Sequence, residues 1–150
     1  MKRKLAWLLL AAAVFAADRA VKLWALTLPD AGLVLIPGIL QLRHTENTGI
    51  AFSLLSGIPW LPAVLSIVVL AAAFWFLRKK QLATWPMTGL MLMLGGALGN
   101  LADRLLSGTV TDMIELLFVR FAVFNVADAC LTVGCAVVIV SLLFRPKDWN

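Results

Sequence analysis

Four long apolar runs divide the chain, and they restrict its fold more than any other feature of the sequence. The runs cover residues 5–28, 60–77, 81–102 and 121–144. The second and third contain no charged residue, and the fourth contains one, Asp128. A helix needs roughly 20 apolar residues to cross the hydrocarbon layer of a bilayer. The sequence therefore predicts an all-α membrane protein with four transmembrane helices.

The composition supports this prediction. The 150 residues are 62% hydrophobic and 14% charged, whereas a soluble domain is about half apolar and about a quarter charged. A soluble globule of this length has too little interior to bury so much apolar surface. An ordinary cytosolic enzyme and a disordered chain are excluded, and the length fits one domain over residues 1–150.

The positive charges predict the orientation of the helices. Eight of the 13 basic residues flank the apolar runs, namely Lys2, Arg3, Lys4, Arg78, Lys79, Lys80, Arg145 and Lys147. Because positive residues mark the cytoplasmic side, we expect a multi-pass membrane protein with both termini in the cytoplasm. The basic clusters are not interleaved with aromatic residues, so nucleic acid is not an expected partner.

The first run has a second interpretation, a secretory signal peptide. Residues 2–4 are basic, residues 5–17 are apolar, and small residues occupy positions 16 and 17, which is the pattern of such a peptide. However, the apolar pattern continues to Leu28, and removal of the run would leave three spans. We therefore expect a retained first span.

The two segments between the spans on the outer side differ in character. In the first, residues 33–36 and 39–42 are short strand-like runs on either side of Pro37-Gly38, which is typical of a turn. They predict a small sheet on the outer surface. The second, residues 105–119, mixes apolar and acidic residues and predicts a short amphipathic helix at the interface, or a loop.

Polar residues gather at one predicted depth, near the outer ends of the spans. They are Asp18, Lys22, Asn47, Asn100, Asp103, Arg104, Asn125 and Asp128. Pairs three or four residues apart share a helix face, so each helix presents a polar stripe to its neighbours. Ionisable groups inside a membrane are costly and mark functional sites. The alternative is a buried polar network that only fixes helix packing.

Small residues lie beside this polar level. Gly95 and Gly99 have the spacing that lets helix backbones approach closely, and a thin helix would also leave room for a substrate. The run lacks the lysine of a phosphate-binding loop, so a nucleotide site is not supported.

The residue types restrict the chemistry. Cys130 and Cys135 fall on different helix faces, and His44 is the single histidine, so we expect no metal site, disulfide or cofactor. Ser53 and Ser56 lack a neighbouring base. Two carboxylates that share a proton could instead activate water and protonate a carbonyl. Three acids of the outer level are candidates, Asp103, Asp112 and Asp128, and spacing does not select a pair.

Five short blocks occur in order along the chain: 18–22 (DRAVK), 47–53 (NTGIAFS), 95–104 (GGALGNLADR), 110–114 (VTDMI) and 124–128 (FNVAD). Together they resemble lipoprotein signal peptidase, the type II signal peptidase of bacteria, over nearly the whole chain. The sequence departs from the family at Ile50, where alanine is most frequent, and at Ala129, where serine is common. These departures bear on substrate fit and local hydrogen bonding.

The resemblance implies an aspartic peptidase embedded in the bacterial inner membrane, with its active site near the outer leaflet. It cuts the signal peptide from a prolipoprotein, just before a cysteine that carries diacylglycerol. Asp112 and Asp128 match the catalytic pair, whose protonation order stays open. The other matching positions are Asn47, Asn100, Arg104 and Asn125, which line the site, the first-span pair Asp18 and Lys22, and the supporting Asp103. The expected partners are the lipid-modified substrate and membrane lipids, with the enzyme a monomer and its outer segments 33–56 and 105–120 clamping the substrate.

Two other classes of function remain alternatives. A small proton- or ion-coupled carrier would use the acids as a relay, although relays string acids through the membrane depth. A structural membrane subunit would use the polar stripes for packing alone. Neither alternative predicts turnover of a lipidated peptide.

Overall fold

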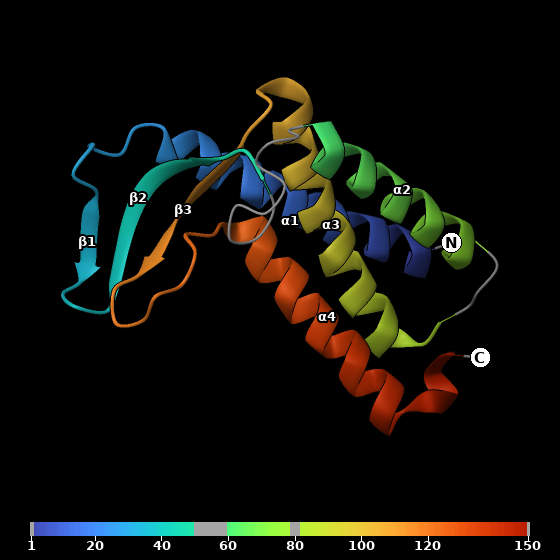
Figure 1. Ribbon diagram of the computed structural model, residues 1–150. Coiled ribbons are helices and arrows are strands. Elements are labelled where there is room, and N and C mark those ends of the chain that lie inside the picture. Colours follow the sequence, from blue (N-terminus) through green and yellow to red (C-terminus); the bar gives the residue numbers. More distant parts are fainter. Residues whose placement is uncertain (1, 50–59, 79–81, 150) are drawn as a thin grey trace.

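The computed structural model describes residues 2–49, 60–78 and 82–149. Within these residues the chain forms four α-helices, a three-stranded sheet and a short 3-10 helix (Figure 1). The helices are α1 (Lys2–Ala25), α2 (Trp60–Leu77), α3 (Thr84–Leu106), α4 (Val126–Phe144) and η2 (Pro146–Trp149), and the strands are β1 (Leu33–Ile36), β2 (Leu40–Asn47) and β3 (Val110–Leu116).

Each predicted apolar run overlaps one of the long helices, but only three of the eight bounds match, namely both bounds of α2 and the end of α4. α1 ends three residues earlier than expected, where Thr27 N donates to Trp24 O at 2.9 Å. α3 continues to Leu106. The prediction that residues 121–125 belong to the fourth helix is wrong, because Phe124 pairs with Ile114 as an isolated bridge and Asn125 is the N-cap of α4.

The helices expose large apolar side chains on their outer surfaces, including Leu8, Phe74 and Leu143. Such surfaces suit contact with lipid rather than with water. By length and composition alone, α4 is the one described helix that qualifies as a membrane span, and the apolar part of α2 covers Trp60–Trp75. α1 and α3 carry most of the buried polar residues, which lowers their own hydropathy.

The sheet projects from one end of the helix bundle and has the antiparallel order β1-β2-β3 (Figure 1). The predicted strand at 33–36 is confirmed, and the one predicted at 39–42 begins at Leu40 and extends to Asn47. The predicted amphipathic helix within 105–119 is wrong, because residues 110–116 form β3. This segment is rich in β-branched residues, and β2 offers it a backbone edge on which Thr45 pairs with Asp112.

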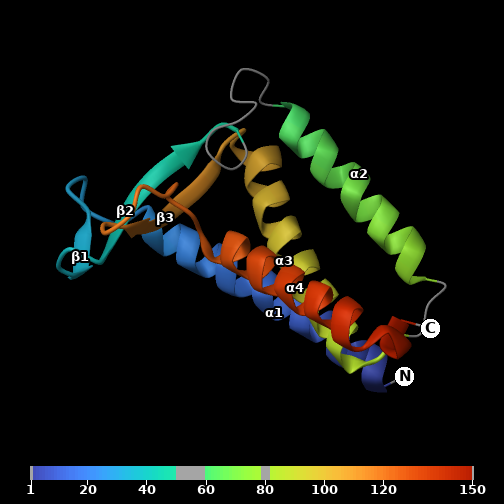
Figure 2. The same ribbon diagram turned by 60° about the horizontal axis from the view of Figure 1, so that its bottom comes forward.

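Glycines allow α3 to pack closely between α1 and α4 (Figure 2). A Cβ added at Gly95 would lie 2.6 Å from the Ala11 carbonyl of α1, and one at Gly96 would lie 2.5 Å from the Ala127 carbonyl of α4. Neither position has room for a side chain. The prediction that the glycine run serves helix packing is therefore confirmed, and the close approach brings the polar ends of the helices together.

Candidate active site

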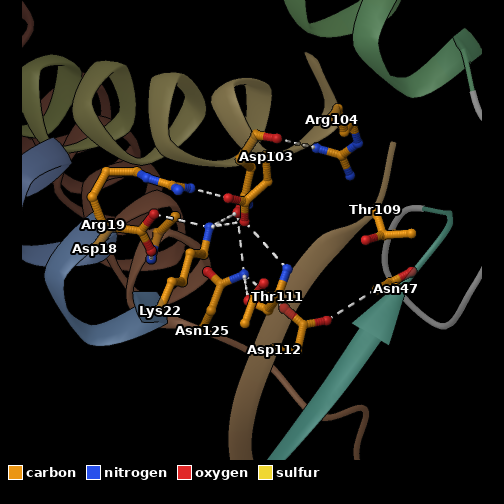
Figure 3. Close-up of polar contacts among 12 residues, drawn as sticks. Asp18, Arg19, Lys22, Asn47, Asp103, Arg104, Thr109, Thr111, Asp112 and Asn125 are labelled. Carbon is orange, nitrogen blue, oxygen red and sulfur yellow. Dashed lines mark hydrogen bonds and ion pairs between the residues drawn. The ribbon is translucent and has the colours of Figure 1, made fainter. Parts of the chain in front are cut away.

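The predicted polar residues meet where the end of α1, the end of α3, the start of α4 and the start of β3 converge (Figure 3). Most of their side chains are buried, namely those of Asp18, Lys22, Asn100, Asp103, Asp112 and Asn125. A buried polar group is costly unless it is hydrogen-bonded. The contacts of these side chains therefore define the site.

Asp112 lies on β3, in the part of this strand that pairs with the end of β2. Asn47, at the end of β2, donates from Nδ2 to Asp112 Oδ2 at 3.1 Å (Figure 3). Asn125, before α4, donates from Nδ2 to Asp112 Oδ1 at 2.6 Å. Both carboxylate oxygens thus accept a side-chain amide, and these bonds fix the orientation of Asp112.

Asp128 is held by the first turn of α4. Asn125 and Asp128 form a capping box, in which Asn125 Oδ1 accepts from Asp128 N at 2.8 Å and Asp128 Oδ2 accepts from Asn125 N at 3.3 Å. Asn100 donates from Nδ2 to Asp128 Oδ1 at 2.7 Å. Because the positive end of the helix dipole also lies here, this position stabilises a negatively charged carboxylate.

Two asparagines join the two acids. Asn125 Nδ2 also donates to Asn100 Oδ1 at 3.1 Å, and Lys22 Nζ donates to the same oxygen at 2.8 Å. Since Asn100 Oδ1 accepts both donors, the Asn100 amide nitrogen must face Asp128. The lysine of α1 therefore sets the orientation of the amide that contacts this acid.

Lys22 and Asp18 fasten α1 to the other helices. Lys22 Nζ lies 2.8 Å from Asp18 Oδ2 and 2.9 Å from Asp103 Oδ2, in addition to its bond to Asn100. These three contacts use the three donors of an ammonium group. Asp18 Oδ1 also accepts from Ala127 N at 2.9 Å, so a carboxylate of α1 caps the start of α4. The predicted i,i+4 pair is confirmed.

Asp103, on α3, forms ion pairs with α1 and a hydrogen bond with β3. Its Oδ1 pairs with Arg19, and its Oδ2 pairs with Lys22 and accepts from Thr111 N at 3.2 Å (Figure 3). Thr111 immediately precedes Asp112, so Asp103 anchors the strand that carries this acid. Arg19 was not singled out from the sequence, although it lies between Asp18 and Lys22 in the first of the five blocks, residues 18–22.

Arg104 faces the loop that follows β2. It donates from Nη2 to Gly49 O at 2.9 Å and from Nη1 to Asn100 O at 3.3 Å. Gly49 N in turn donates to Asn47 Oδ1 at 2.9 Å. Ile50, Ser53 and Ser56, which entered the sequence interpretation, lie outside the described residues.

The electrostatic environment gives Asp112 a higher pKa than that of an ordinary aspartate. Burial raises the pKa of Asp112 from 3.8 to about 6, and the nearby charge of Asp128 acts in the same direction. The amide donors of Asn47 and Asn125 oppose this rise in pKa. The Asp112 carboxyl group therefore keeps its proton to a higher pH than an exposed aspartate does.

A cavity of about 800 Å³ opens onto both acids. Its polar part includes Asn47, Asn100, Arg104, Asp112 and Asp128, and its walls are otherwise mainly apolar. The apolar walls come largely from α2, α4 and the 121–124 segment before α4, including Leu65, Val69, Phe124 and Leu131. The sequence did not single out these residues, because apolar residues that line a cavity look like those that face lipid. Ala129, one of the departures from the family, also lines this cavity.

The residue types at the site limit its ligand chemistry. Within residues 2–49, 60–78 and 82–149, no three His, Cys, Asp or Glu side chains come together in a way that could hold a metal ion. Cys130 and Cys135 are free thiols on α4. The chemistry available here is that of two carboxyl groups with amide and guanidinium donors around them.

Comparisons with known proteins cover most of the chain. The model of the signal peptidase (SPase) II family matches residues 10–144. The lipoprotein signal peptidase of Lactococcus lactis subsp. cremoris (strain SK11) is 37% identical over 145 residues, which are 95% of this chain and 96% of the relative. That of Streptococcus pneumoniae (strain ATCC BAA-255 / R6) is 40% identical over 116 residues, 77% of this chain and 76% of the relative.

Solved structures agree with the sequence matches. A bacterial membrane enzyme determined by the in meso method at 2.3 Å resolution has a TM-score of 0.87 at 29% identity, covering 97% of this chain and 92% of the other. A second, determined at 1.9 Å resolution, has a TM-score of 0.83 at 30% identity and covers 93% of this chain and 94% of the other.

Proposed function

The chain belongs to the signal peptidase II family, and on that premise we propose that Asp112 and Asp128 are its catalytic pair. Members of this family are aspartic-type membrane peptidases that remove signal peptides from prolipoproteins, and that is the function of this chain. One observation carries the assignment of the pair. The two carboxylates that open onto the large cavity are joined through the amides of Asn100 and Asn125.

The surroundings of the two acids give them different roles. Asp112 carries the shared proton, because burial and the charge of Asp128 raise its pKa to about 6, and a bound substrate that excludes water would raise this pKa further. Asp128 acts as the base, because the start of α4 and the Asn100 amide stabilise a negative charge at this position. This order was left open by the sequence.

The reaction then follows general acid–base chemistry. Asp128 takes a proton from water, whose oxygen attacks the scissile carbonyl carbon, while Asp112 gives its proton to the carbonyl oxygen. In the second step the C–N bond breaks, Asp128 returns its proton to the leaving nitrogen, and Asp112 regains a proton from the hydroxyl that becomes the new carboxyl group. Both acids end in their starting states.

The cavity suits a lipidated substrate. Its apolar walls continue from the acids along α2 and α4, so a diacylglyceryl cysteine could place its lipid there while the preceding peptide bond lies over the acids. Asn47 and Arg104 border the same space and are the substrate-binding donors. The predicted clamp consists of residues 33–56 and 105–120, and the sheet formed by β1, β2 and β3 within them would hold one side of the substrate. Residues 50–56 of the first segment lie outside the described residues.

The membrane arrangement completes the proposal. α1 to α4 each cross the inner membrane, both termini lie in the cytoplasm, and residues 1–150 form a single monomeric domain. The supporting observations are basic residues at the start of α1 and just after α2 and α4, namely Arg3, Arg78 and Arg145, and the buried polar residues at the opposite ends of the helices. A proton-coupled carrier is disfavoured because the described acids of α1, α3 and α4 gather at that one end.

The proposal is tested with the purified full-length chain and a diacylglyceryl-modified precursor peptide. Asp112→Asn and Asp128→Asn should each abolish cleavage while the protein still inserts into the membrane. Asp30→Asn is the matched control, since this acid is exposed before β1, and it should cleave normally. Near wild-type turnover by either site variant would refute the pair, and absence of turnover by the wild-type chain would favour a carrier or a structural subunit.

A further inference from the structure

A second cavity lies at the end of the helix bundle opposite the carboxylates and has a volume of about 470 Å³. It is formed where the start of α1, the start of α3 and the C-terminal η2 converge (Figure 2). Its mainly polar walls include Arg3, Thr84, Trp85, Arg145, Lys147 and Asp148. None of these residues contributes to the active site, so the cavity requires an explanation of its own.

The charges around this cavity are unbalanced. Asp148 Oδ2 pairs with Arg145 Nε at 3.1 Å. In the described part of the chain no carboxylate forms an ion pair with Arg3 or Lys147, although Arg3 Nη2 donates to Thr84 Oγ1 at 3.3 Å. Three cations and one acid therefore leave an excess of two positive charges beside the cavity.

The start of α3 adds to the positive potential. Its N-cap residue, Ala83, makes no side-chain capping bond, and its first turn contains no acid. Thr84 and Trp85 of that turn line the cavity. The N-terminus of a helix favours an anion because its first N–H groups lack partners within the helix. The cavity thus combines two uncompensated cations with a positive helix end.

Apolar surfaces border the cavity on the lipid side. Leu143 and Phe144, in the last turn of α4, are 70% and 77% exposed, and Leu5 in the first turns of α1 is 58% exposed. Trp85 is 53% exposed, as is common for tryptophan at the boundary between hydrocarbon and headgroups. A free anion would make no use of these surfaces, whereas the acyl chains of a lipid would cover them.

We propose that this cavity binds the phosphate headgroup of an anionic phospholipid of the cytoplasmic leaflet. The phosphate would lie between Arg3, Lys147 and the start of α3, and the acyl chains would extend along α4 and α1. Basic pockets between helices on the cytoplasmic side are suited to such headgroups. Because its walls come from α1, α3 and η2, a bound lipid would tie the two ends of the chain to the centre of the bundle.

The test measures lipid binding to the purified full-length chain in a mild detergent. Native mass spectrometry counts bound phosphatidylglycerol, and the midpoint of thermal unfolding is recorded with phosphatidylglycerol, phosphatidylcholine or inorganic phosphate added. Phosphatidylglycerol should bind and raise the midpoint, whereas phosphatidylcholine and inorganic phosphate should not. In the Arg3→Gln/Lys147→Gln variant the affinity for phosphatidylglycerol should fall about 30-fold, because each such cation contributes roughly fivefold.

The control is Arg120→Gln, which removes one exposed positive charge at the opposite end of the molecule, and it should retain the binding. If the double variant does not fold, Lys147→Gln alone is the test variant, because Lys147 lies in the exposed η2, and it should weaken phosphatidylglycerol binding about fivefold. Lys147→Arg keeps the positive charge and should bind phosphatidylglycerol as the wild type does. The proposed site would be overturned by any of three results. The double variant could bind phosphatidylglycerol as tightly as the wild type, Arg120→Gln could lose as much affinity as the double variant, or phosphatidylglycerol could fail to raise the midpoint of unfolding. Equal stabilisation by inorganic phosphate would overturn the assignment to a lipid.

Discussion

Asp112 should make the folded protein less stable as the pH rises, and this effect can be measured. The carboxyl group is buried, and its pKa rises from 3.8 to about 6 on folding. Between these values the folded state binds the proton that the unfolded state has lost, so the free energy of unfolding falls as the pH rises. At 1.36 kcal/mol per pKa unit, the total loss is about 3 kcal/mol.

The perturbation is Asp112→Asn, which cannot ionise. Wild type and variant differ in their free energy of unfolding, and this difference has two parts. One part is constant and comes from the altered hydrogen bonds to Asn47 and Asn125, and the other depends on pH. Asp112 contributes its full stabilisation below about pH 3.8 and loses it as the pH rises through about 6. Of the 3 kcal/mol, about 2 kcal/mol should be lost by the wild type relative to the variant between pH 4.5 and 7.5.

The assay is equilibrium unfolding in mixed micelles, followed by tryptophan fluorescence, at half-unit steps of pH. Asp30→Asn reports the general effect of removing one exposed carboxylate from the same side of the molecule. A difference between wild type and Asp112→Asn that is constant with pH would refute the reasoning. A difference that increases with pH would mean that the amide donors outweigh burial and stabilise the ionised form.

Three further substitutions test the surrounding contacts by the same unfolding assay, together with the cleavage assay. Lys22→Met should destabilise the protein by about 3–5 kcal/mol, because it leaves Asp18 and Asp103 buried with their shared cation gone; a loss below 1 kcal/mol would contradict this. Gly99→Ala should cost about 1–3 kcal/mol and reduce cleavage, because its Cβ would collide with the Asp18 carboxylate; unchanged cleavage and stability would show that α1 and α3 can separate freely. Arg43→Gln should cost at most about 1 kcal/mol, since Arg43 and its partner Glu115 are 43% and 24% exposed; a larger loss would assign the sheet a bigger share of the stability.

The long helices were predictable because each one overlaps a long run of apolar residues, whose transfer out of water is favourable. The β1–β2 hairpin was predictable for a local reason as well, since Pro37-Gly38 separates two short apolar runs. β3 was not predictable in the same way. Residues 105–119 mix apolar and acidic side chains without a clear period, and the strand forms because the edge of β2, distant in sequence, pairs with it.

The site was predictable as a group of residues but not as a set of roles. The spacing of Asp18 and Lys22 indicated their pairing, and the helix order indicated that Asn100 and Asn125 share one level. Spacing could not choose among the acids. In the fold, Asp103 has both oxygens occupied by Arg19, Lys22 and Thr111, whereas Asp112 and Asp128 open onto the cavity.

The hydrogen bond from Ala127 N to Asp18 has a consequence for synthesis of the protein. The two residues are 109 positions apart, and a ribosome adding roughly 5–20 residues per second needs about 5–20 s to produce the partner of Asp18 after Asp18 itself. During that interval Lys22, one turn away, is the partner available within the same helix. Asp18 therefore has its partner on α1 from the start, and the contact that joins α1 to α4 forms only when this last helix has been synthesised.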